Sequence, residues 1–508
     1  MWATATATVS IPESIPRRVQ LPILMGACLL LLVQALTLFS TRWVEDENWY
    51  SIPAHTLITR GELSNPAFQD TALLGKFDAR PPMVFFIMAG FFKVLGTSLY
   101  SARLPFLLSG LACLFLTYLL GCELGRPWVG LLGAVALATD NLFFLASRTA
   151  RPESMTAAFA LLGILVYLYS RRKNSVKLAF LSGLIVGVAA LVHPNGLAAA
   201  ISAGVFALLE FRWSVVRQPR PWAFVAGLLL PLSLYVAWGM SGAVHRANFI
   251  GMYAYGEGYA LHDIPHVEMT RYRDFLGLGS MRVNLPINIP TRLHIVLALF
   301  LSAIALCRYD RDLLKNILCL ILPTMFWWAY LRNITPRYIA TGSPYLALLV
   351  AGAVVALWSS RPRWRKAVAA CATLLLLSQV AGNYLLLYLY RQADYAAVTR
   401  QLRALIPADG HVYGALTFWM AFNDQPFYSW NRTSLKYAVD HGVNYLILND
   451  RVLLHGSGLG TDDWVIERTA AAAFVKDHAT LIGYAPNPFY GNLEIYRVNA
   501  HLARGANP

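Results

Sequence analysis

The sequence predicts a polytopic α-helical membrane protein with about eleven transmembrane helices and a small α/β domain at its C-terminal end. Hydrophobic residues make up 57% of the 508 residues and charged residues only 14%, whereas a soluble domain carries roughly 25% charged residues. Apolar runs long enough to cross a bilayer recur through residues 1–390, and residues 391–508 alternate strand-like and helix-like stretches instead. This composition excludes both a soluble enzyme and a disordered chain.

The first apolar run is predicted to be an uncleaved span, because no small-residue cleavage site follows it directly. The run Met83–Leu95 is short for a span and contains Lys93, so we interpret it as interfacial or re-entrant. The predicted spans lie near residues 20–40, 102–121, 127–146, 155–170, 176–192, 196–211, 222–240, 292–307, 313–331, 337–358 and 366–390.

Basic residues predict the orientation of these spans. With Met83–Leu95 outside the bilayer, nearly all Lys and Arg residues of the short loops fall on one side, and the short loops of the other side hold only Arg148, Arg151, Arg332 and Arg337. Because Lys and Arg collect in cytoplasmic loops, we expect a cytoplasmic N-terminus and an extracytoplasmic C-terminal domain. The net charge of +15 then needs no nucleic-acid partner. The six cysteines lie in or beside apolar segments, so neither disulfides nor a zinc site is expected.

Three pieces are expected outside the cytoplasm: the loops at about 41–101 and 241–291, and the domain at 391–508 that follows the transmembrane domain 1–390. In this last domain, Tyr395–Leu405 has helical spacing and ends at a turn signal. Further helices are expected at Ser434–Asp440 and Trp464–Asp477, and strands at His411–Leu416, Val443–Leu448, Thr480–Tyr484 and Leu493–Val498.

Candidate chemistry begins in the first outer loop, where Glu45, Asp46 and Glu47 stand together between aromatic residues. The turns between later spans place further polar groups on the same side, namely Arg151 with Glu153, His193, and Arg337 with Tyr338. Each turn alone has a structural explanation, such as an ion pair, a helix cap or an arginine reaching lipid headgroups. Their convergence with an acidic loop on one face indicates a site at the membrane surface.

The second outer loop offers aromatic and histidine side chains. Tyr253 and Tyr255 fit either an interfacial belt or a lid that contacts a sugar, and both interpretations stay open. His262 and His266 have helical spacing, but Pro265 between them argues against a regular helix and a zinc site.

The motifs Asp46-Glu47, Tyr50, Gly61, Arg80-Pro81-Pro82 and Ala102-Arg103-Leu104-Pro105 resemble the start of the lipid-linked-sugar glycosyltransferases of the GT-C fold. The similarity is greatest to bacterial aminoarabinose transferases and protein O-mannosyltransferases, which are glycosyltransferase family 39-like enzymes. It covers about the first 350 residues, through Arg151-Pro152-Glu153 and Pro336-Arg337-Tyr338.

The resemblance implies roles for these residues. Asp46 would be the catalytic carboxylate with Glu47 beside it, and Glu153 would match a second acidic position that is usually Asp. Arg80 stands where the aminoarabinose transferases have a Lys that contacts the donor phosphate, and His193 also replaces a Lys. From the residues themselves, the candidate donor-phosphate ligands are Arg80, Arg151, His193 and Arg337, and the candidate substrate-binding residues are Tyr50 and Tyr338 and, if the second outer loop is a lid, Tyr253 and Tyr255.

The implied reaction moves a sugar, with inversion, from a polyprenyl-phosphate donor to a lipid, polysaccharide or protein acceptor on the outer face of a bacterial inner membrane. Such chemistry serves the cell envelope, in lipopolysaccharide or protein glycosylation. No cofactor is expected, because arginines supply positive charge, although Asp46, Glu47, Glu153 and His193 leave a divalent metal as an alternative. A flippase of lipid-linked sugars and a polysaccharide polymerase or ligase are the rival functions. The spans carry almost no charge at their centres, which disfavours the flippase.

Overall fold

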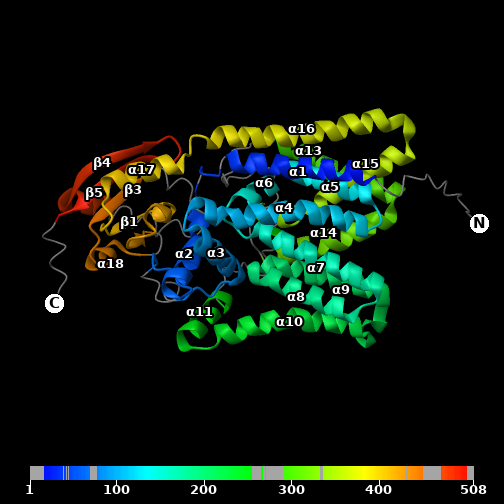
Figure 1. Ribbon diagram of the computed structural model, residues 1–508, viewed down its shortest axis with the longest axis horizontal. Coiled ribbons are helices and arrows are strands. Elements are labelled where there is room, and N and C mark those ends of the chain that lie inside the picture. Colours follow the sequence, from blue (N-terminus) through cyan, green and yellow to red (C-terminus); the bar gives the residue numbers. More distant parts are fainter. Residues whose placement is uncertain are drawn as a thin grey trace, which may run out of the picture.

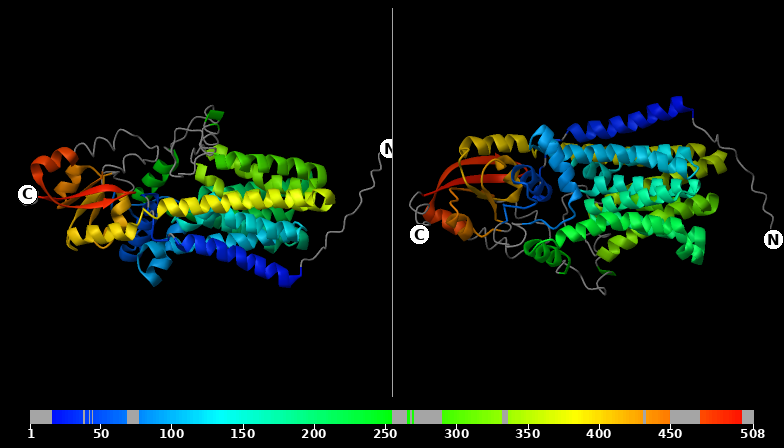
Figure 2. Two further views of the ribbon diagram at one scale, coloured as in Figure 1. Left: turned by 90° about the horizontal axis from the view of Figure 1, so that it is seen from above. Right: turned by 60° about the horizontal axis from the view of Figure 1, so that its bottom comes forward.

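The computed structural model describes residues 16–68 except 38, 42 and 44, residues 77–254, 265–266, 269, 290–331, 336–430, 433–449 and 471–499. Helices with roughly aligned axes form an elongated bundle, and a small mixed α/β domain covers one end of it (Figure 1). Two short helices, α2 (Glu45–Arg60) and α3 (Met83–Leu95), lie at the junction between the bundle and this domain (Figures 1 and 2). The predicted fold class, a membrane helix bundle with a small C-terminal α/β domain, is confirmed.

Every predicted span has a helical counterpart in the bundle. The helices are α1 (Arg17–Thr37), α4 (Leu99–Glu123), α5 (Pro127–Thr139), α6 (Asn141–Arg148), α7 (Glu153–Lys173), α8 (Val176–Val192), α9 (Leu197–Phe211), α10 (Pro219–Gly239), α13 (Pro290–Tyr309), α14 (Arg311–Leu331), α15 (Ser343–Ser360) and α16 (Arg365–Tyr390). Within the described residues, 8 helices are long and apolar enough to cross a membrane, or up to 9 if the bent pair α5–α6 is one span. Helix α8 and the described apolar part of α13 fall below that length, so the predicted count of eleven stays a prediction.

The bend between α5 and α6 has a local cause. Asp140 ends α5 and caps α6, because its side chain accepts a hydrogen bond from the Phe143 amide at 2.7 Å. The two axes differ by 68°, whereas the sequence predicted one continuous span at 127–146. The predicted span at 337–358 is likewise divided: a 3₁₀ helix, η4 (Pro336–Thr341), precedes α15.

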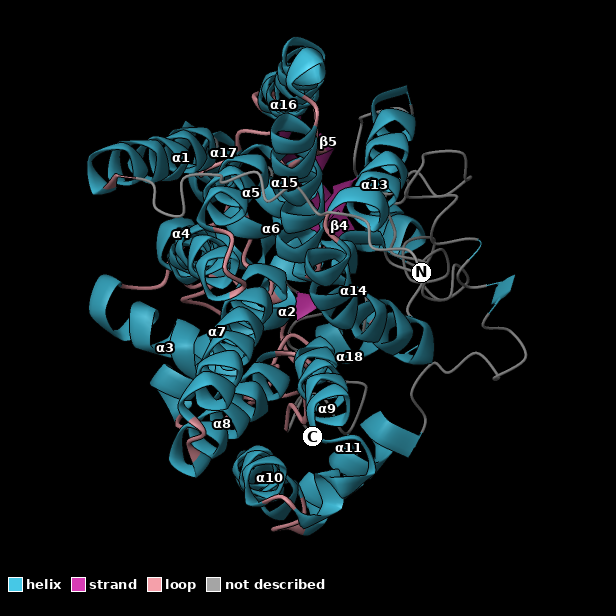
Figure 3. Cartoon of the chain, turned by 90° about the vertical axis from the view of Figure 1, so that its right-hand side faces the viewer, coloured by secondary structure: helices cyan, strands magenta, loops and turns pink. Residues whose placement is uncertain are grey.

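Glycines allow the close packing of α8 against α10, which lie side by side in the end-on view of Figure 3. A Cβ on Gly183 would stand 2.0 Å from the Phe224 carbonyl oxygen, and one on Gly227 would stand 2.1 Å from the Phe180 carbonyl oxygen. Small residues let membrane helices approach in this way. The connections α7–α8, α9–α10 and α15–α16, which carry many of the basic residues, lie at the bundle end away from the α/β domain (Figure 1).

The α/β domain contains a five-stranded sheet with strand order β2-β1-β3-β5-β4. Strand β1 (Val412–Gly414) pairs in parallel with β2 (Phe427–Ser429) and β3 (Tyr445–Asn449), and β5 (Gly491–Val498) pairs antiparallel with β3 and β4 (Ala479–Asn487). The helices are α17 (Tyr395–Leu405), α18 (Leu435–Asp440) and a 3₁₀ helix, η6 (Leu416–Phe422). All four predicted strands have a counterpart and β2 was missed. The predicted helix at 464–477 lies partly outside the described residues. Its described part is helical, and the helix there covers residues 471–478.

The domain shares its hydrophobic core with the first outer loop. Trp43 and Ile52 on the loop side, Phe85 of α3, and Leu416 and Ile495 of the domain belong to one continuous buried cluster. The bundle has a separate core. The division of the chain into domains at residue 390 stays a prediction, because this shared core joins α2 and α3 to the residues beyond it.

Candidate functional site

The candidate site forms where α2 meets the amino end of α7. Asp46 is the second residue of α2, and Glu153 is the first residue of α7, positions where a helix dipole favours a carboxylate. Arg151 lies between them: its Nη1 is 2.7 Å from Asp46 Oδ2, and its Nε and Nη2 lie 3.0 and 2.9 Å from Glu153 Oε1. Asp46 is 29% exposed, whereas Glu153 is 2% exposed. Asp46 is therefore the more accessible carboxylate of this Asp46–Arg151–Glu153 cluster.

The guanidinium of Arg151 stays charged in this setting. Burial alone would lower its pKa, but Glu153 and then Asp46 raise the pKa well above its ordinary value. One cation thus pairs with two carboxylates, and the formal charge of the cluster is net negative.

Arg80 lies beside Tyr50. Its Nε donates to both Asp78 carboxylate oxygens at 2.8 and 3.1 Å, and its Nη2 donates to Asp78 and to the Trp49 carbonyl. The guanidinium carbon lies 5.1 to 5.2 Å from the ring centres of Trp49, Tyr50 and Phe85. These aromatic and acidic neighbours fix the orientation of the Arg80 guanidinium. The Arg80 side chain remains 21% exposed.

Both arginines act electrostatically on Tyr50. Burial is the main cause that raises the pKa of its hydroxyl, Tyr338 adds to the increase, and Arg151 and Arg80 oppose it. The hydroxyl therefore remains protonated at neutral pH and can donate a hydrogen bond. These mutual effects place Tyr50, Arg80, Arg151, Glu153 and Tyr338 within electrostatic reach of one another.

His193 lies between α8 and the short 3₁₀ helix η1 (Pro194–Gly196), with its ring centre 4.9 Å from that of Tyr338. Its Nδ1 accepts a hydrogen bond from the Asn195 amide at 3.2 Å, so the neutral ring carries its proton on Nε2. Burial lowers the pKa of His193 to about 4. At neutral pH His193 is therefore an uncharged hydrogen-bond donor rather than a cation.

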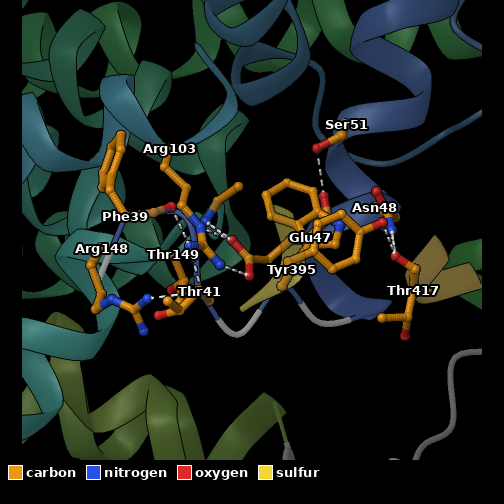
Figure 4. A network of polar contacts seen from close by, with 12 residues as sticks. Phe39, Thr41, Glu47, Asn48, Ser51, Arg103, Arg148, Thr149, Tyr395 and Thr417 are labelled. Carbon is orange, nitrogen blue, oxygen red and sulfur yellow. Dashed lines mark hydrogen bonds and ion pairs between the residues drawn. The ribbon is translucent and has the colours of Figure 1, made fainter. Parts of the chain in front are cut away.

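Glu47 has a different environment from Asp46. Its carboxylate is fully buried and accepts bonds from Arg103 Nη2 at 2.6 Å, Arg103 Nε at 2.8 Å and the Ala150 amide at 2.8 Å (Figure 4). Arg103 Nη1 also donates to the carbonyls of Phe39 and Thr41, at 2.7 and 2.8 Å. Glu47 thus ties α2 to the bundle.

The structure brings most of the predicted site residues together: Asp46, Tyr50, Arg80, Arg151, Glu153, His193 and Tyr338. The side chains of Arg337 and Tyr253, and the whole of Tyr255 and His262, lie outside the described residues. The roles predicted for all of these residues stay predictions. Among the described residues, no three His, Cys, Asp or Glu side chains gather closely enough to hold a metal ion.

Sequence reasoning missed the partners that hold the site. Asp78 fixes Arg80, and Arg103 fixes Glu47. A signal existed for Arg103, because a charged residue inside an apolar run needs a partner. Asp78 stands two positions from Arg80, the same spacing as Arg151 and Glu153, whereas no local signal marked the contact between Asn48 and the α/β domain.

Residues 79–238 match the family described as dolichyl-phosphate-mannose-protein mannosyltransferase. An uncharacterised protein of Aquifex aeolicus strain VF5 is 26% identical over 242 residues, which cover 45% of this chain and 46% of that protein, so the match spans about half of each.

Two solved structures share the overall architecture. ArnT from Cupriavidus metallidurans, bound to undecaprenyl phosphate, is 13% identical with a TM-score of 0.65, over 97% of this chain and 100% of that chain. The oligosaccharyltransferase AglB from Archaeoglobus fulgidus, in complex with an inhibitory peptide and a dolichol-phosphate, is 12% identical with a TM-score of 0.50, over 94% of this chain and 74% of that chain. The chain therefore has the GT-C fold, and its resemblance to the membrane glycosyltransferases that use lipid-linked sugars is confirmed.

Proposed function

We propose that this protein is an inverting glycosyltransferase that moves a sugar from a polyprenyl-phosphate donor to an acceptor hydroxyl at the outer membrane surface. The observation that carries the proposal is the partly exposed carboxylate of Asp46, held by Arg151 at the junction of the bundle and the α/β domain. The donor class is supported by the undecaprenyl phosphate bound to ArnT and the dolichol-phosphate bound to AglB.

In the proposed step, the acceptor oxygen forms a bond to the anomeric carbon as the bond from that carbon to the phosphate oxygen breaks. The electron pair leaves with the polyprenyl phosphate, and Asp46 takes the acceptor proton. General-base assistance of this kind contributes about 10²–10⁴-fold. If the acceptor were itself a phosphate, no base would be needed and Asp46 would orient the sugar.

The environments of the carboxylates favour inversion. A retaining mechanism needs a carboxylate that attacks the anomeric carbon, in addition to an acid or base. Glu153 is buried and bound by Arg151, and Glu47 is buried and bound by Arg103. Asp46 is the one carboxylate of these three with substantial exposure, which suits a single base and direct displacement.

Positive groups are needed where charge develops on the departing phosphate. We assign Arg80, Arg151 and Arg337 to this role, since a guanidinium can contact two phosphate oxygens. His193 would donate from Nε2 as a neutral group. Tyr50 and Tyr338 lie beside the arginines, where their hydroxyls would bind the sugar or phosphate.

The orientation is part of the proposal. The basic residues at the carboxyl end of α7, in η2 (Arg212–Arg217) and in η5 (Pro362–Trp364) lie at the bundle end away from the α/β domain. The distribution of positive charge therefore favours a cytoplasmic position for that end and an extracytoplasmic position for the site. A bacterial inner membrane, and a lipid, glycan or protein acceptor, complete the proposal.

The test uses purified protein in nanodiscs, a panel of radiolabelled undecaprenyl-phosphate sugars and a membrane extract as acceptor. Wild type is expected to release undecaprenyl phosphate with one donor and to form a product of inverted anomeric configuration. Asp46→Asn should lose at least about 10²-fold in turnover. The control is Asp424→Asn, which changes an exposed carboxylate of the α/β domain that pairs with Arg403 and should keep full activity. Full turnover by Asp46→Asn, or movement of the intact lipid between leaflets without transfer, would refute the proposal.

A further inference from the structure

The amino end of α2 is held from two sides. Consecutive residues on an α-helix point about 100° apart, so Asp46, Glu47 and Asn48 face three different directions. Glu47 points to Arg103 of the bundle, and Asn48 points to the α/β domain (Figure 4). Asp46 faces the third direction, toward Arg151.

The contact on the domain side is a pair of buried hydrogen bonds. Asn48 Nδ2 donates to the Leu416 carbonyl at 2.7 Å and to the Thr417 carbonyl at 3.2 Å, both in η6. The hydroxyl of Tyr395, the first residue of α17, donates to the same Thr417 carbonyl at 2.8 Å. Asn48 is fully buried, so it acts on the domain rather than on a substrate.

Trp43, two residues before α2, also contacts both the bundle and the domain. The Trp43 ring lies 5.1 Å from the Arg103 guanidinium and 6.3 Å from the Tyr395 ring. Its carbonyl accepts a hydrogen bond from the Tyr490 hydroxyl at 3.0 Å. Bundle and domain therefore meet on both sides of the segment that carries Asp46.

We propose that the α/β domain positions α2, the helix that carries Asp46. Asn48 is the positioning residue, because its hydrogen bonds to the domain fix the helix and thereby Asp46. This inference rests on the proposed function, in which Asp46 is the base. A displacement of about 1 Å at a reacting group costs about 10²-fold in rate, so a contact two residues along the helix affects turnover without touching the substrate. The domain is then a working part of the enzyme.

The test compares two amides that both join the domain to the rest of the chain. Asn48→Ala removes the two hydrogen bonds from α2 to the domain. Asn423→Ala removes a bond of 3.4 Å to the Thr97 carbonyl in the loop between α3 and α4, and serves as the matched control. Asn48→Ala should lower kcat by about 10-fold or more and change the donor KM by less than about 3-fold. Asn423→Ala should keep the kcat of wild type.

A milder variant protects the test against misfolding. Tyr395→Phe keeps the ring and removes only the hydroxyl that fixes the Thr417 carbonyl, so kcat should fall in the same direction by a smaller factor. Wild-type kcat in both Asn48→Ala and Tyr395→Phe would overturn the inference, as would a loss equal to that of Asn423→Ala.

Hydrogen–deuterium exchange separates this inference from the proposed function, because it needs no substrate. In the intact protein, amides of residues 45–51 should exchange faster in Asn48→Ala than in wild type or Asn423→Ala. Unchanged exchange there would refute the domain's hold on α2. Full activity of Asp46→Asn would instead refute the proposed function.

Discussion

Replacing Arg103 by methionine removes the guanidinium that neutralises Glu47 in the buried junction between α2 and the bundle. The variant leaves the Glu47 carboxylate with the Ala150 amide as its remaining donor among the contacts described above. It also removes the donor to the Phe39 carbonyl, whereas the Thr41 carbonyl keeps a bond of 3.1 Å from Arg148. Loss of one partner from a buried ion pair costs about 3–5 kcal/mol. We expect Arg103→Met to lower the free energy of unfolding by this amount.

The double variant Glu47→Gln/Arg103→Met should recover part of the loss. The glutamine carries no charge and still accepts from the Ala150 amide, so the main remaining defect is the Phe39 carbonyl, worth about 1–3 kcal/mol. The expected order of stability is wild type, then the double variant, then Arg103→Met. Arg126→Met is the control, because Arg126 is 44% exposed and its surface pair with Asp310 contributes about 1 kcal/mol or less.

Equilibrium unfolding in mixed detergent micelles measures these differences, with all four proteins under one set of conditions. A double variant that is no more stable than Arg103→Met would refute the assignment of Glu47 as the uncompensated charge. A loss in Arg103→Met no larger than that in Arg126→Met would refute the buried pair itself.

Three further results are expected. Burial lowers the pKa of His193 to about 4, whereas the ordinary value is about 6.5, so between these pH values the unfolded chain binds a proton that the folded protein excludes. The free energy of unfolding therefore falls with acidification. Between pH 7 and pH 4, wild type should lose up to about 3 kcal/mol more than His193→Gln in unfolding measurements. Arg337→Ala should weaken donor use, seen as a raised donor KM, more than it reduces the amount of protein in the membrane. The control is Arg308→Ala, in the last turn of α13. Equal losses would leave Arg337 an anchoring role. With the exposed Cys307 and Cys371 replaced by serine, an impermeant thiol reagent should label Lys436→Cys but not Ser214→Cys in intact cells, and the reverse pattern would contradict the proposed orientation.

Strong local patterns predicted most of the fold. Apolar runs gave the helices of the bundle, and the spacing at Tyr395–Leu405 gave α17 with its bounds. The break at Asp140 was missed although an aspartate inside an apolar run is a good helix cap. Strand β2 was missed because it is three residues long and exists through its pairing with β1.

The candidate site was predictable in outline for a different reason. Spans that alternate in direction bring every second turn to the same face, which predicted that Asp46 and the turn of Arg151 and Glu153 share a face; the structure adds that they are in contact. The partners of individual side chains could not be predicted from the sequence. Asn48 and Leu416 are 368 positions apart, and no pattern within either segment specifies that they meet.

The charges of the described site pose a physical problem that the proposed reaction must solve. Arg80 and Arg151 face the carboxylates of Asp78, Asp46 and Glu153, and His193 is neutral, so this set is net negative before a phosphate arrives. Additional positive charge would favour phosphate binding there. Arg337 and a divalent cation are the two candidate sources, which makes the Arg337→Ala result and the effect of a chelator two halves of one question. A large rise in donor KM in Arg337→Ala, with no inhibition of wild type by EDTA, would assign the charge to arginine; the opposite pair of results would assign it to a metal ion.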